Sequence, residues 1–248
     1  MDHGNFVWYE YTAADPGSAA GFYGSVMGWT AEAAEVAGIR FTMFRADGTP
    51  VAAMYPLQDL DPGTPKGWTG YVAVRDLDEA ATRMEEAGGA AVRRLTVGDM
   101  RLGVFKDPQG ARIAMMENCE PRNLAYGTKG TMGWHELLAA DWESVFGTYS
   151  DLFGWTKGIA MEGCPTGVYQ IIQSEGRDIG AMMTKVPDVP EPTWLFYVFT
   201  DSITAAAERV HAAGGQVIFG PQEVPGGMWI INALDPQGSS IALVGPLG

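Results

Sequence analysis

Two glutamates stand at matching places in the chain, each two residues after a tryptophan. Glu10 ends the stretch WYE (8–10), Glu136 ends the stretch WHE (134–136), and both stretches lie in runs typical of β-strands. A carboxylate on the buried face of a strand must find a partner, or its pKa rises. Such a group can anchor a ligand by hydrogen bonds or act as a general base, so both glutamates are candidate catalytic residues. The structural alternative is an ion pair of Glu10 with Arg112, and hydrogen bonds from backbone amides to Glu136.

The glutamates match because the chain is a tandem duplication. MGWT (27–30) returns as FGWT (153–156), 126 residues later. DPQG (107–110) returns after 128 residues, which predicts two extra residues in the last hairpin alone. Each half has the length of an ordinary domain. We therefore expect one domain over 1–120, a linker over 121–132 and a second domain over 133–248.

Each half divides again into two quarters of the same plan. The segment after Asp15 is typical of a helix, because aspartate suits the N-cap and proline suits the first turn. Residues 76–89 and their copy over 202–215 place apolar side chains at helical spacing. Short runs typical of strands follow each helix. The sequence thus predicts four βαβββ modules, with DPQG as a tight turn that has no chemical role.

Composition narrows the class of protein. The formal net charge is −14, which argues against binding to nucleic acid and to anionic membrane surfaces. No apolar run approaches the roughly 18 residues that a membrane span needs, and the first residues do not follow the plan of a signal peptide. Cys119 and Cys164 occupy unrelated positions of the two halves, so we expect free thiols. These features predict a cytoplasmic protein, as a monomer or a homodimer.

The four βαβββ modules resemble the glyoxalase/bleomycin-resistance/extradiol-dioxygenase superfamily, also called vicinal oxygen chelates. The paired W-x-E, GW, GG and DPQG stretches are similar to its tandem two-domain glyoxalase-like branch, whose members often carry the label "putative hydroxylase". The resemblance covers nearly the whole chain. It implies an α+β fold of two tandem glyoxalase-like domains, whose mixed sheets curl into cups that each hold a ligand. In most enzymes of the superfamily it also implies a divalent metal bound by His, Glu or Gln.

The positions that the resemblance assigns to metal ligands do not carry such residues here. They fall on Trp8, Ala52, Thr69 and Ala114 in the first half, and on Trp134, Gly180, Leu195 and Ala242 in the second. Zinc, iron and manganese need imidazole, carboxylate or thiolate ligands. We therefore expect no metal and no other cofactor.

Aromatic residues are expected to line the cups instead. Side chains alternate along a strand, so residues two positions from the assigned ones also face inward. The candidate ligand-binding residues are Trp8, Tyr71, Arg112, Trp134, Tyr197, Phe199 and Trp229. The alternative is that the tryptophans and tyrosines simply fill the core. His135 is expected to face the helices. The stretch MWIINALD (228–235), which carries Trp229 and Asn232, has no counterpart in the first half, so the two cups differ in the shapes they recognise, or only one works.

Three functions remain open from the sequence. The first is a metal-independent protein that binds a hydrophobic, partly aromatic metabolite, of the antibiotic resistance or sequestration type. The second is a metal-free acid–base enzyme of natural-product biosynthesis, with Glu10 or Glu136 as the reacting group. The third is a metal-dependent lyase, dioxygenase or hydroxylase. A fold by itself does not choose among them, and whether the protein turns over its ligand stays open.

Overall fold

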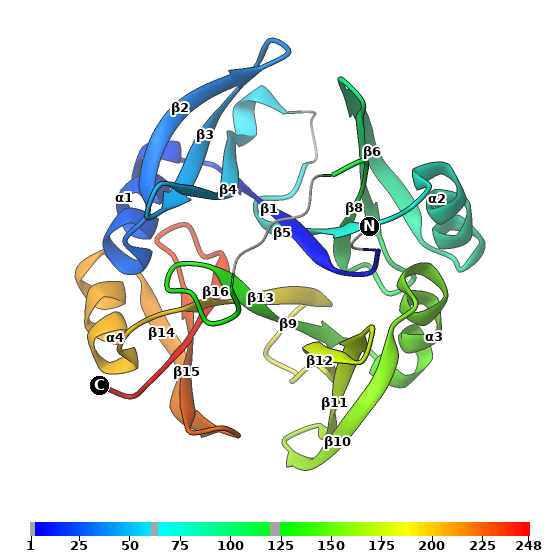
Figure 1. Ribbon diagram of the computed structural model, residues 1–248. Helices are drawn as coiled ribbons and strands as arrows, with labels where there is room; N and C mark the ends of the chain where they lie inside the picture. The colour runs from blue at the N-terminus through cyan, green and yellow to red at the C-terminus, as the bar shows by residue number, and fades with distance from the viewer. Residues whose placement is uncertain (1–2, 61–63, 120–124) are drawn as a thin grey trace. The chain divides into compact units, whose positions relative to one another are not determined.

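The fold of this computed structural model is α+β (Figure 1). The structure describes residues 3–60, 64–119 and 125–248, which contain four α-helices and one short 3-10 helix. The first half contains β1 (Phe6–Ala13), α1 (Pro16–Met27), β2 (Thr30–Val36), β3 (Ile39–Ala46), β4 (Thr49–Pro56), the short 3-10 helix η1 (Leu57–Asp59), β5 (Gly67–Ala73), α2 (Leu77–Glu86), β6 (Ala90–Val97), β7 (Met100–Lys106) and β8 (Arg112–Glu117). The second half contains β9 (Met132–Ala139), α3 (Trp142–Phe153), β10 (Thr156–Cys164), β11 (Gly167–Ser174), β12 (Arg177–Thr184), β13 (Thr193–Phe199), α4 (Ile203–Ala212), β14 (Gln216–Val224), β15 (Met228–Leu234) and β16 (Ser240–Gly245). The predicted order of strand, helix and three strands is confirmed in all four quarters.

The strands form two mixed sheets of eight. The first has the order β2-β3-β4-β1-β5-β8-β7-β6, and the second repeats it as β10-β11-β12-β9-β13-β16-β15-β14. Within a quarter the first strand pairs in parallel with the last one, as β9 does with β12, and the other pairs are antiparallel. This confirms the mixed sheets that the resemblance implies. We refer to the four quarters as modules 1 to 4.

The helices begin where the capping residues predict. Asp15 and Asp141 accept hydrogen bonds from backbone amides of the first turns of α1 and α3. Both helices end at a glycine with positive φ, Gly28 (73°) and Gly154 (70°), a conformation that costs glycine little. None of the helices among the described residues is long and apolar enough to cross a membrane.

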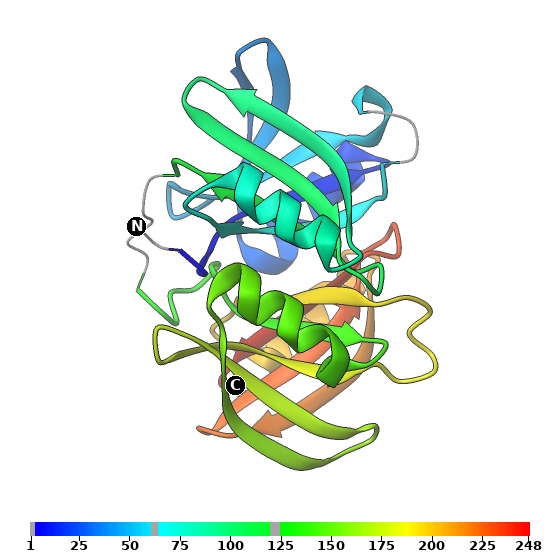
Figure 2. The same ribbon diagram turned by 90° about the vertical axis from the view of Figure 1, so that its right-hand side faces the viewer.

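The chain divides into two compact units, and each unit takes modules from both halves. Unit 1 comprises Met1–Trp8, Thr69–Asn123 and Trp134–Leu195, and unit 2 comprises Tyr9–Trp68, Leu124–Gly133 and Phe196–Gly248. In unit 2, α1 lies beside α4 (Figure 1). In unit 1, α2 lies beside α3 (Figure 2). The domain boundaries at 120 and 133 stay a prediction for the repeat in the sequence.

The DPQG turn of the second half carries a buried hydrogen-bond centre of unit 2. Asp235 is buried, and one of its carboxylate oxygens accepts the hydroxyls of Tyr11 and Tyr23, the latter at 2.9 Å. The indole Nε1 of Trp68 donates to the Tyr23 hydroxyl at 2.8 Å. Burial raises the pKa of Tyr23 well above its usual value, so its hydroxyl stays protonated and donates. A side chain of module 4 therefore bonds two tyrosines of module 1, and Trp68 at the start of module 2 donates to one of them.

Unit 1 contains an equivalent hydrogen-bond centre, built on the DPQG turn of the first half (107–110). Buried Asp107 accepts the hydroxyl of Tyr149 at 2.9 Å, and Trp194 Nε1 donates to that hydroxyl at 3.1 Å. Burial raises the pKa of Asp107. The turn also caps the neighbouring helix, since the amide of Gln109 bonds both the N–H and the C=O of Asp141. The prediction that DPQG is a tight turn is confirmed, and the turn also joins modules of opposite halves.

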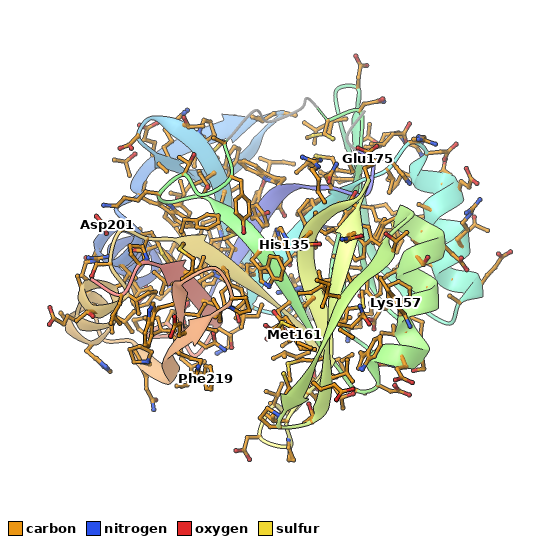
Figure 3. All side chains as sticks on the ribbon, turned by 60° about the horizontal axis from the view of Figure 1, so that its bottom comes forward. His135, Lys157, Met161, Glu175, Asp201 and Phe219 are labelled. Atoms are coloured by element: carbon orange, nitrogen blue, oxygen red, sulfur yellow. The ribbon has the colours of Figure 1, made fainter. Side chains whose placement is uncertain are left out.

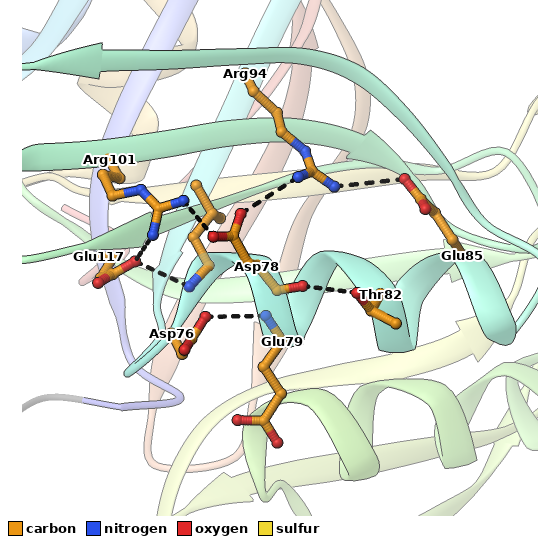
Figure 4. Close-up of polar contacts among 9 residues, drawn as sticks. Asp76, Asp78, Glu79, Thr82, Glu85, Arg94, Arg101 and Glu117 are labelled. Atoms are coloured by element: carbon orange, nitrogen blue, oxygen red, sulfur yellow. Dashed lines mark hydrogen bonds and ion pairs between the residues drawn. The ribbon is translucent and has the colours of Figure 1, made fainter.

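Charged side chains hold α2 against β7 and β8 in unit 1 (Figure 4). Arg101 bonds Asp78 at 2.7 Å and Glu117 at 3.1 Å, and Glu117 also accepts the backbone amide of Leu77. The hydrogen bond from Arg101 holds the pKa of Asp78 below its usual value. Because Asp78 is exposed, its ion pair with Arg101 contributes little to stability.

His135 lies buried on the opposite side of β9 from Glu136, as the alternation predicts. Its ring stacks on Phe6 with centroids 3.9 Å apart, and its Nδ1 lies 2.6 Å from the carbonyl oxygen of Ile179. Only a protonated Nδ1 can donate to a carbonyl, so this tautomer is fixed. Burial lowers the pKa of His135 to about 4. The residue is therefore neutral at physiological pH and acts as part of the core.

We expect His135 to make folding sensitive to acid. Its pKa is lower in the folded state than in the unfolded state, so the unfolded chain takes up the proton first. The contribution of His135 to the free energy of unfolding is therefore fully present above about pH 6.5. It is lost as the pH falls towards 4, by up to roughly 3 kcal/mol. Urea unfolding at a series of pH values measures this. His135→Gln should flatten the slope between pH 6.5 and 4, whereas His211→Gln, at an exposed site, should not. Equal slopes in the wild type and both variants would refute this assignment.

Candidate functional site

Strand pairing fixes which side chains share a face with the two glutamates. Glu136 pairs with Ala181 of β12, and His135 pairs with Gly180. Glu10 likewise pairs with Ala53 of β4. We call the face of module 1 that carries Glu10, and the face of module 3 that carries Glu136, the inner face of that module.

Two of the assigned metal-ligand positions are therefore wrong by one residue. Ala52 pairs with Phe44, which packs against Trp29 on the helical side, so Ala52 does not share the inner face with Glu10. Gly180 also faces away from Glu136, and a Cβ there would come within 2.0 Å of the His135 carbonyl oxygen. The residues that do face inward, Ala53 and Ala181, carry no metal-binding group either.

A chain of three hydrogen-bonded side chains occupies the inner face of module 3. The indole Nε1 of Trp134 donates to the hydroxyl of Tyr169 at 2.9 Å, and that hydroxyl donates to Glu136 Oε2 at 2.9 Å. The direction is fixed, because an indole can only donate and a carboxylate can only accept. Burial, and secondly the charge of Glu136, raise the pKa of Tyr169 well above its usual value. The phenol therefore stays protonated and holds one oxygen of a largely buried carboxylate in place.

Apolar and sulfur-containing side chains lie beside the hydrogen-bonded residues Trp134, Tyr169 and Glu136. Ile171 pairs with Ala181 and Met161 pairs with Tyr169, so both lie on the inner face. Figure 3 shows Met161 on β10, with Lys157 further along the same strand beside α3. Lys157 lies over the Trp142 ring, with its Nζ 4.8 Å from the ring centroid.

Burial, and then the charge of Glu136, raise the pKa of the Cys164 thiol. This thiol is therefore protonated and is a poor nucleophile or metal ligand.

In module 1 the position that corresponds to Tyr169 does not carry a phenol. Strand β10 has nine residues and β2 has seven, so two extra residues also precede β11, and the prediction that the last hairpin alone was longer is wrong. With this shift, Tyr169 corresponds to Phe41, which packs against Tyr55 with ring centroids 5.5 Å apart. Glu10 is nearly as buried as Glu136, but position 41 offers it no hydroxyl. The two glutamates are thus equivalent in the sequence and different in their surroundings.

The other candidate residues fall into the two units. In unit 1, Tyr71 is fully buried and pairs with Ala114, whereas Arg112 is half-buried at the start of β8. Trp8 is buried in unit 1 as well. A cup made from a whole half would combine residues of both units and stays a prediction.

In unit 2, Tyr197 pairs with Ala242 and Phe199 pairs with Val244. Asn232 pairs with Ala242 and so shares their face. Trp229 is an odd number of residues from Asn232 in a regular ladder, which places it on the opposite face. A role of Trp229 in ligand binding stays a prediction.

Sequence reasoning selected Trp134 and Glu136 but missed Tyr169, which links them. The signal was present, because alternation along GVYQIIQS (167–174) puts Tyr169 and Ile171 on one face. What the sequence does not show is which face of β11 turns towards Glu136. That depends on the register of β11, β12 and β9.

The residues of module 3 do not fit a metal ion. Among the described residues, no group of three or more His, Cys, Asp or Glu is placed to hold one. The inner face of module 3 offers one carboxylate, already bonded to a phenol, and a protonated thiol. Divalent transition metals are usually held by at least three protein ligands.

Sequence comparison identifies the family. The Glyoxalase/Bleomycin resistance protein/Dioxygenase superfamily matches the chain twice, over residues 5–115 and 131–243. The chain belongs to this superfamily. The fold agrees, since the crystal structure of the Mn(II)-bound glyoxalase from Novosphingobium aromaticivorans superposes with a TM-score of 0.68 at 14% identity, covering 100% of this chain and 83% of that one.

Two curated relatives align along almost the whole chain. "Putative glyoxylase CFP32" of Mycobacterium tuberculosis is 29% identical over 96% of this chain and 94% of its own length. "Anthracycline biosynthesis protein DnrV" of Streptomyces peucetius is also 29% identical, over 96% of this chain and 92% of its own length.

Proposed function

We propose that the protein binds a small, partly aromatic metabolite without a metal ion, and that Trp134, Tyr169 and Glu136 form the centre of the site. The hydrogen-bonded chain of these three residues carries the proposal. It holds a carboxylate in one orientation beside an indole ring, on a face that is otherwise mostly apolar. Few, fixed polar groups in apolar surroundings are typical of small-molecule sites.

The site suits a ligand that combines a planar ring with a hydroxyl. An ionised carboxylate accepts hydrogen bonds and cannot donate them, so it selects a donor on the ligand. The indole of Trp134 offers an aromatic surface, and a stacked pair is worth about 0.5–1.5 kcal/mol beyond the buried area. The name of the relative from Streptomyces peucetius refers to anthracycline biosynthesis, which supports a hydroxylated polycyclic aromatic compound. Such binding fits a resistance protein that sequesters its ligand, and it also fits a protein that acts beside the enzymes of natural-product biosynthesis.

An acid–base enzyme is the alternative that a specific observation favours. Glu136 and Tyr169 are in direct contact, so a base and an acid stand side by side. If the protein turns over its ligand, Glu136→Gln should abolish turnover while binding is retained. If it only binds, Glu136→Gln should weaken binding and no chemical change of the ligand should appear in mass spectra. A metal-dependent lyase, dioxygenase or hydroxylase has less support, because the donor set does not fit a metal.

Other features of the proposal come from the sequence. We propose that Trp8, Tyr71 and Arg112 in unit 1 take part in ligand binding, and separately that Glu10, Tyr197 and Phe199 do so in unit 2. The protein is proposed to be cytoplasmic, a monomer or homodimer, and to bind neither nucleic acid nor membranes.

We expect Tyr169→Phe to weaken ligand binding about tenfold. The variant places in module 3 the residue that module 1 has naturally, Phe41. It removes one hydroxyl, which orients Glu136 and accepts the indole N–H of Trp134. A lost hydrogen bond to a charged group costs about 1.5–3 kcal/mol, and a factor of ten corresponds to 1.4 kcal/mol. Calorimetric titration with 1,8-dihydroxyanthraquinone as the probe measures the affinity. Trp134→Phe should remove the change in indole emission on binding.

The control is Tyr55→Phe, which removes a phenol hydroxyl from module 1 and should bind the probe like the wild type. If Tyr169→Phe, Trp134→Phe and Glu136→Gln all bind as tightly as the wild type, the ligand does not use this site.

Metal removal should leave the protein unchanged. Because no cluster of three metal-binding side chains exists among the described residues, dialysed protein should hold well below one equivalent of zinc, iron or manganese. Elemental analysis and calorimetry before and after EDTA check both points. Stoichiometric metal whose removal abolishes probe binding would overturn the metal-free proposal.

A further inference from the structure

A second polar group lies on an apolar sheet face, this time in unit 2. Asn232 of β15 is half-buried, and its Oδ1 is buried without a hydrogen-bond partner among the described residues. A buried polar group without a partner is costly, and most such groups in folded proteins are paired. The unpaired Oδ1 of Asn232 therefore favours a hydrogen-bond partner that is not part of the chain.

The neighbours of Asn232 form one row across four strands. Asn232 pairs with Phe219 of β14 on one side and with Ala242 of β16 on the other, and Ala242 pairs with Tyr197 of β13. In a regular ladder paired residues share a face, as Asn232, Ala242 and Tyr197 do, and Phe219 lies opposite Asn232 between two register shifts of β14. Strand spacing gives the row a length of about 14 Å. We call it the Asn232 row. Two aromatic residues bound it, and an amide and a methyl group lie between them.

The next level of the same face is apolar. Ile230 pairs with Val244, which pairs with Phe199. Phe199 in turn contacts the ring of Tyr126, with centroids 4.9 Å apart. Phe219 is half exposed, at 50% of its maximal area, so the β14 end of the row is open to solvent.

Module 2 shows that this fold does not require the amide. There, Arg93 pairs with Val104, Val104 with Ala114, and Ala114 with Tyr71. Alanine and tyrosine are the same in both rows, whereas valine replaces Asn232 and arginine replaces Phe219. Valine at the central position serves packing alone. The asparagine of module 4 thus forgoes apolar packing, and its Oδ1 gains no hydrogen-bond partner among the described residues.

We propose that the Asn232 row is a second binding site, which takes the edge of a planar aromatic ligand that carries a hydroxyl next to a carbonyl. A primary amide presents an acceptor and a donor side by side, so it matches a ligand edge with the complementary pair. Phe219 and Tyr197 flank the ring system, and Ala242 leaves room for it. The ligand class rests on the proposed function, but the site does not, since it lies in unit 2 and Glu136 lies in unit 1.

The test compares wild type with Asn232→Val, which copies module 2 and is therefore compatible with the fold. The variant should unfold at a higher temperature, because it removes an unpaired buried polar group. It should also lose binding of 1,8-dihydroxyanthraquinone at one class of sites, with at least a tenfold weaker affinity by calorimetry. In the wild type, the probe should shift the side-chain amide NMR signal of Asn232.

Tyr169→Phe separates this site from the one in module 3. If Asn232→Val binds the probe like the wild type while Tyr169→Phe is weakened, the second site is refuted and the proposed function stands. If Asn232→Val alone is weakened, the second site stands and the module 3 site falls. A variant that is more stable but binds normally would show that water alone solvates Asn232, and no binding to any of the proteins would overturn both sites for this ligand class.

Discussion

Asp235→Ala should destabilise the protein by about 3–5 kcal/mol, a large part of the 5–15 kcal/mol that folded proteins usually have. One carboxylate oxygen of Asp235 accepts the hydroxyls of Tyr11 and Tyr23, and the other accepts the backbone amides of Gln237 and Ser239. Alanine would leave these donors buried without an acceptor, and each costs about 1–3 kcal/mol when unpaired. The total is less than their sum because the turn can relax.

Urea unfolding followed by tryptophan fluorescence measures the loss. Tyr23→Phe should cost less, about 1–2 kcal/mol, since it removes one hydroxyl and leaves the carboxylate with its other donors. Asp188→Ala, at an exposed turn residue, is the matched control and should stay within about 0.5 kcal/mol of the wild type. A stability of Asp235→Ala equal to that of the control would show that the DPQG turn does not hold modules 1 and 4 together.

The two halves of the chain should fail to fold when they are produced separately. Unit 2 joins α1 of the first half to α4 of the second, and unit 1 joins α2 to α3. A chain that ends after residue 122 would keep Tyr23 and Trp68 but lose Asp235, the buried acceptor of the Tyr23 hydroxyl. The complementary chain would keep Tyr149 and Trp194 but lose Asp107. Each fragment would expose apolar helix faces and an unpaired hydrogen-bond centre.

We expect neither fragment to unfold cooperatively alone, and an equimolar mixture to regain a cooperative transition. Thermal unfolding and analytical ultracentrifugation distinguish the two states. The intact chain cut by a protease between residues 120 and 124 is the control, because it contains both fragments already assembled. A fragment that unfolds cooperatively as a monomer would mean that the modules of one half make a stable domain without their partners.

Local and periodic features were readable from the sequence. The duplication, the four βαβββ modules, the helix starts at Asp15 and Asp141 and the turns at DPQG all follow from capping, spacing and turn chemistry within a few residues. The faces of β1 and β9 also followed, since alternation separates Glu136 from His135. The absence of imidazole and carboxylate at the assigned metal positions was visible in the same way.

Only the tertiary structure decided what those faces meet. The register of β12 against β9 moved the inward position from Gly180 to Ala181, and the longer β10 brought Tyr169 to Glu136 where module 1 has Phe41. A shift of one residue in a strand exchanges the two faces, and a local sequence pattern does not fix the shift between strands far apart in the chain. The same holds for Asp107 and Asp235, whose partners lie in the other half of the chain, 42 and 212 residues away for Tyr149 and Tyr23. The sequence determined which residues could do chemistry, and long-range packing decided which of them meet.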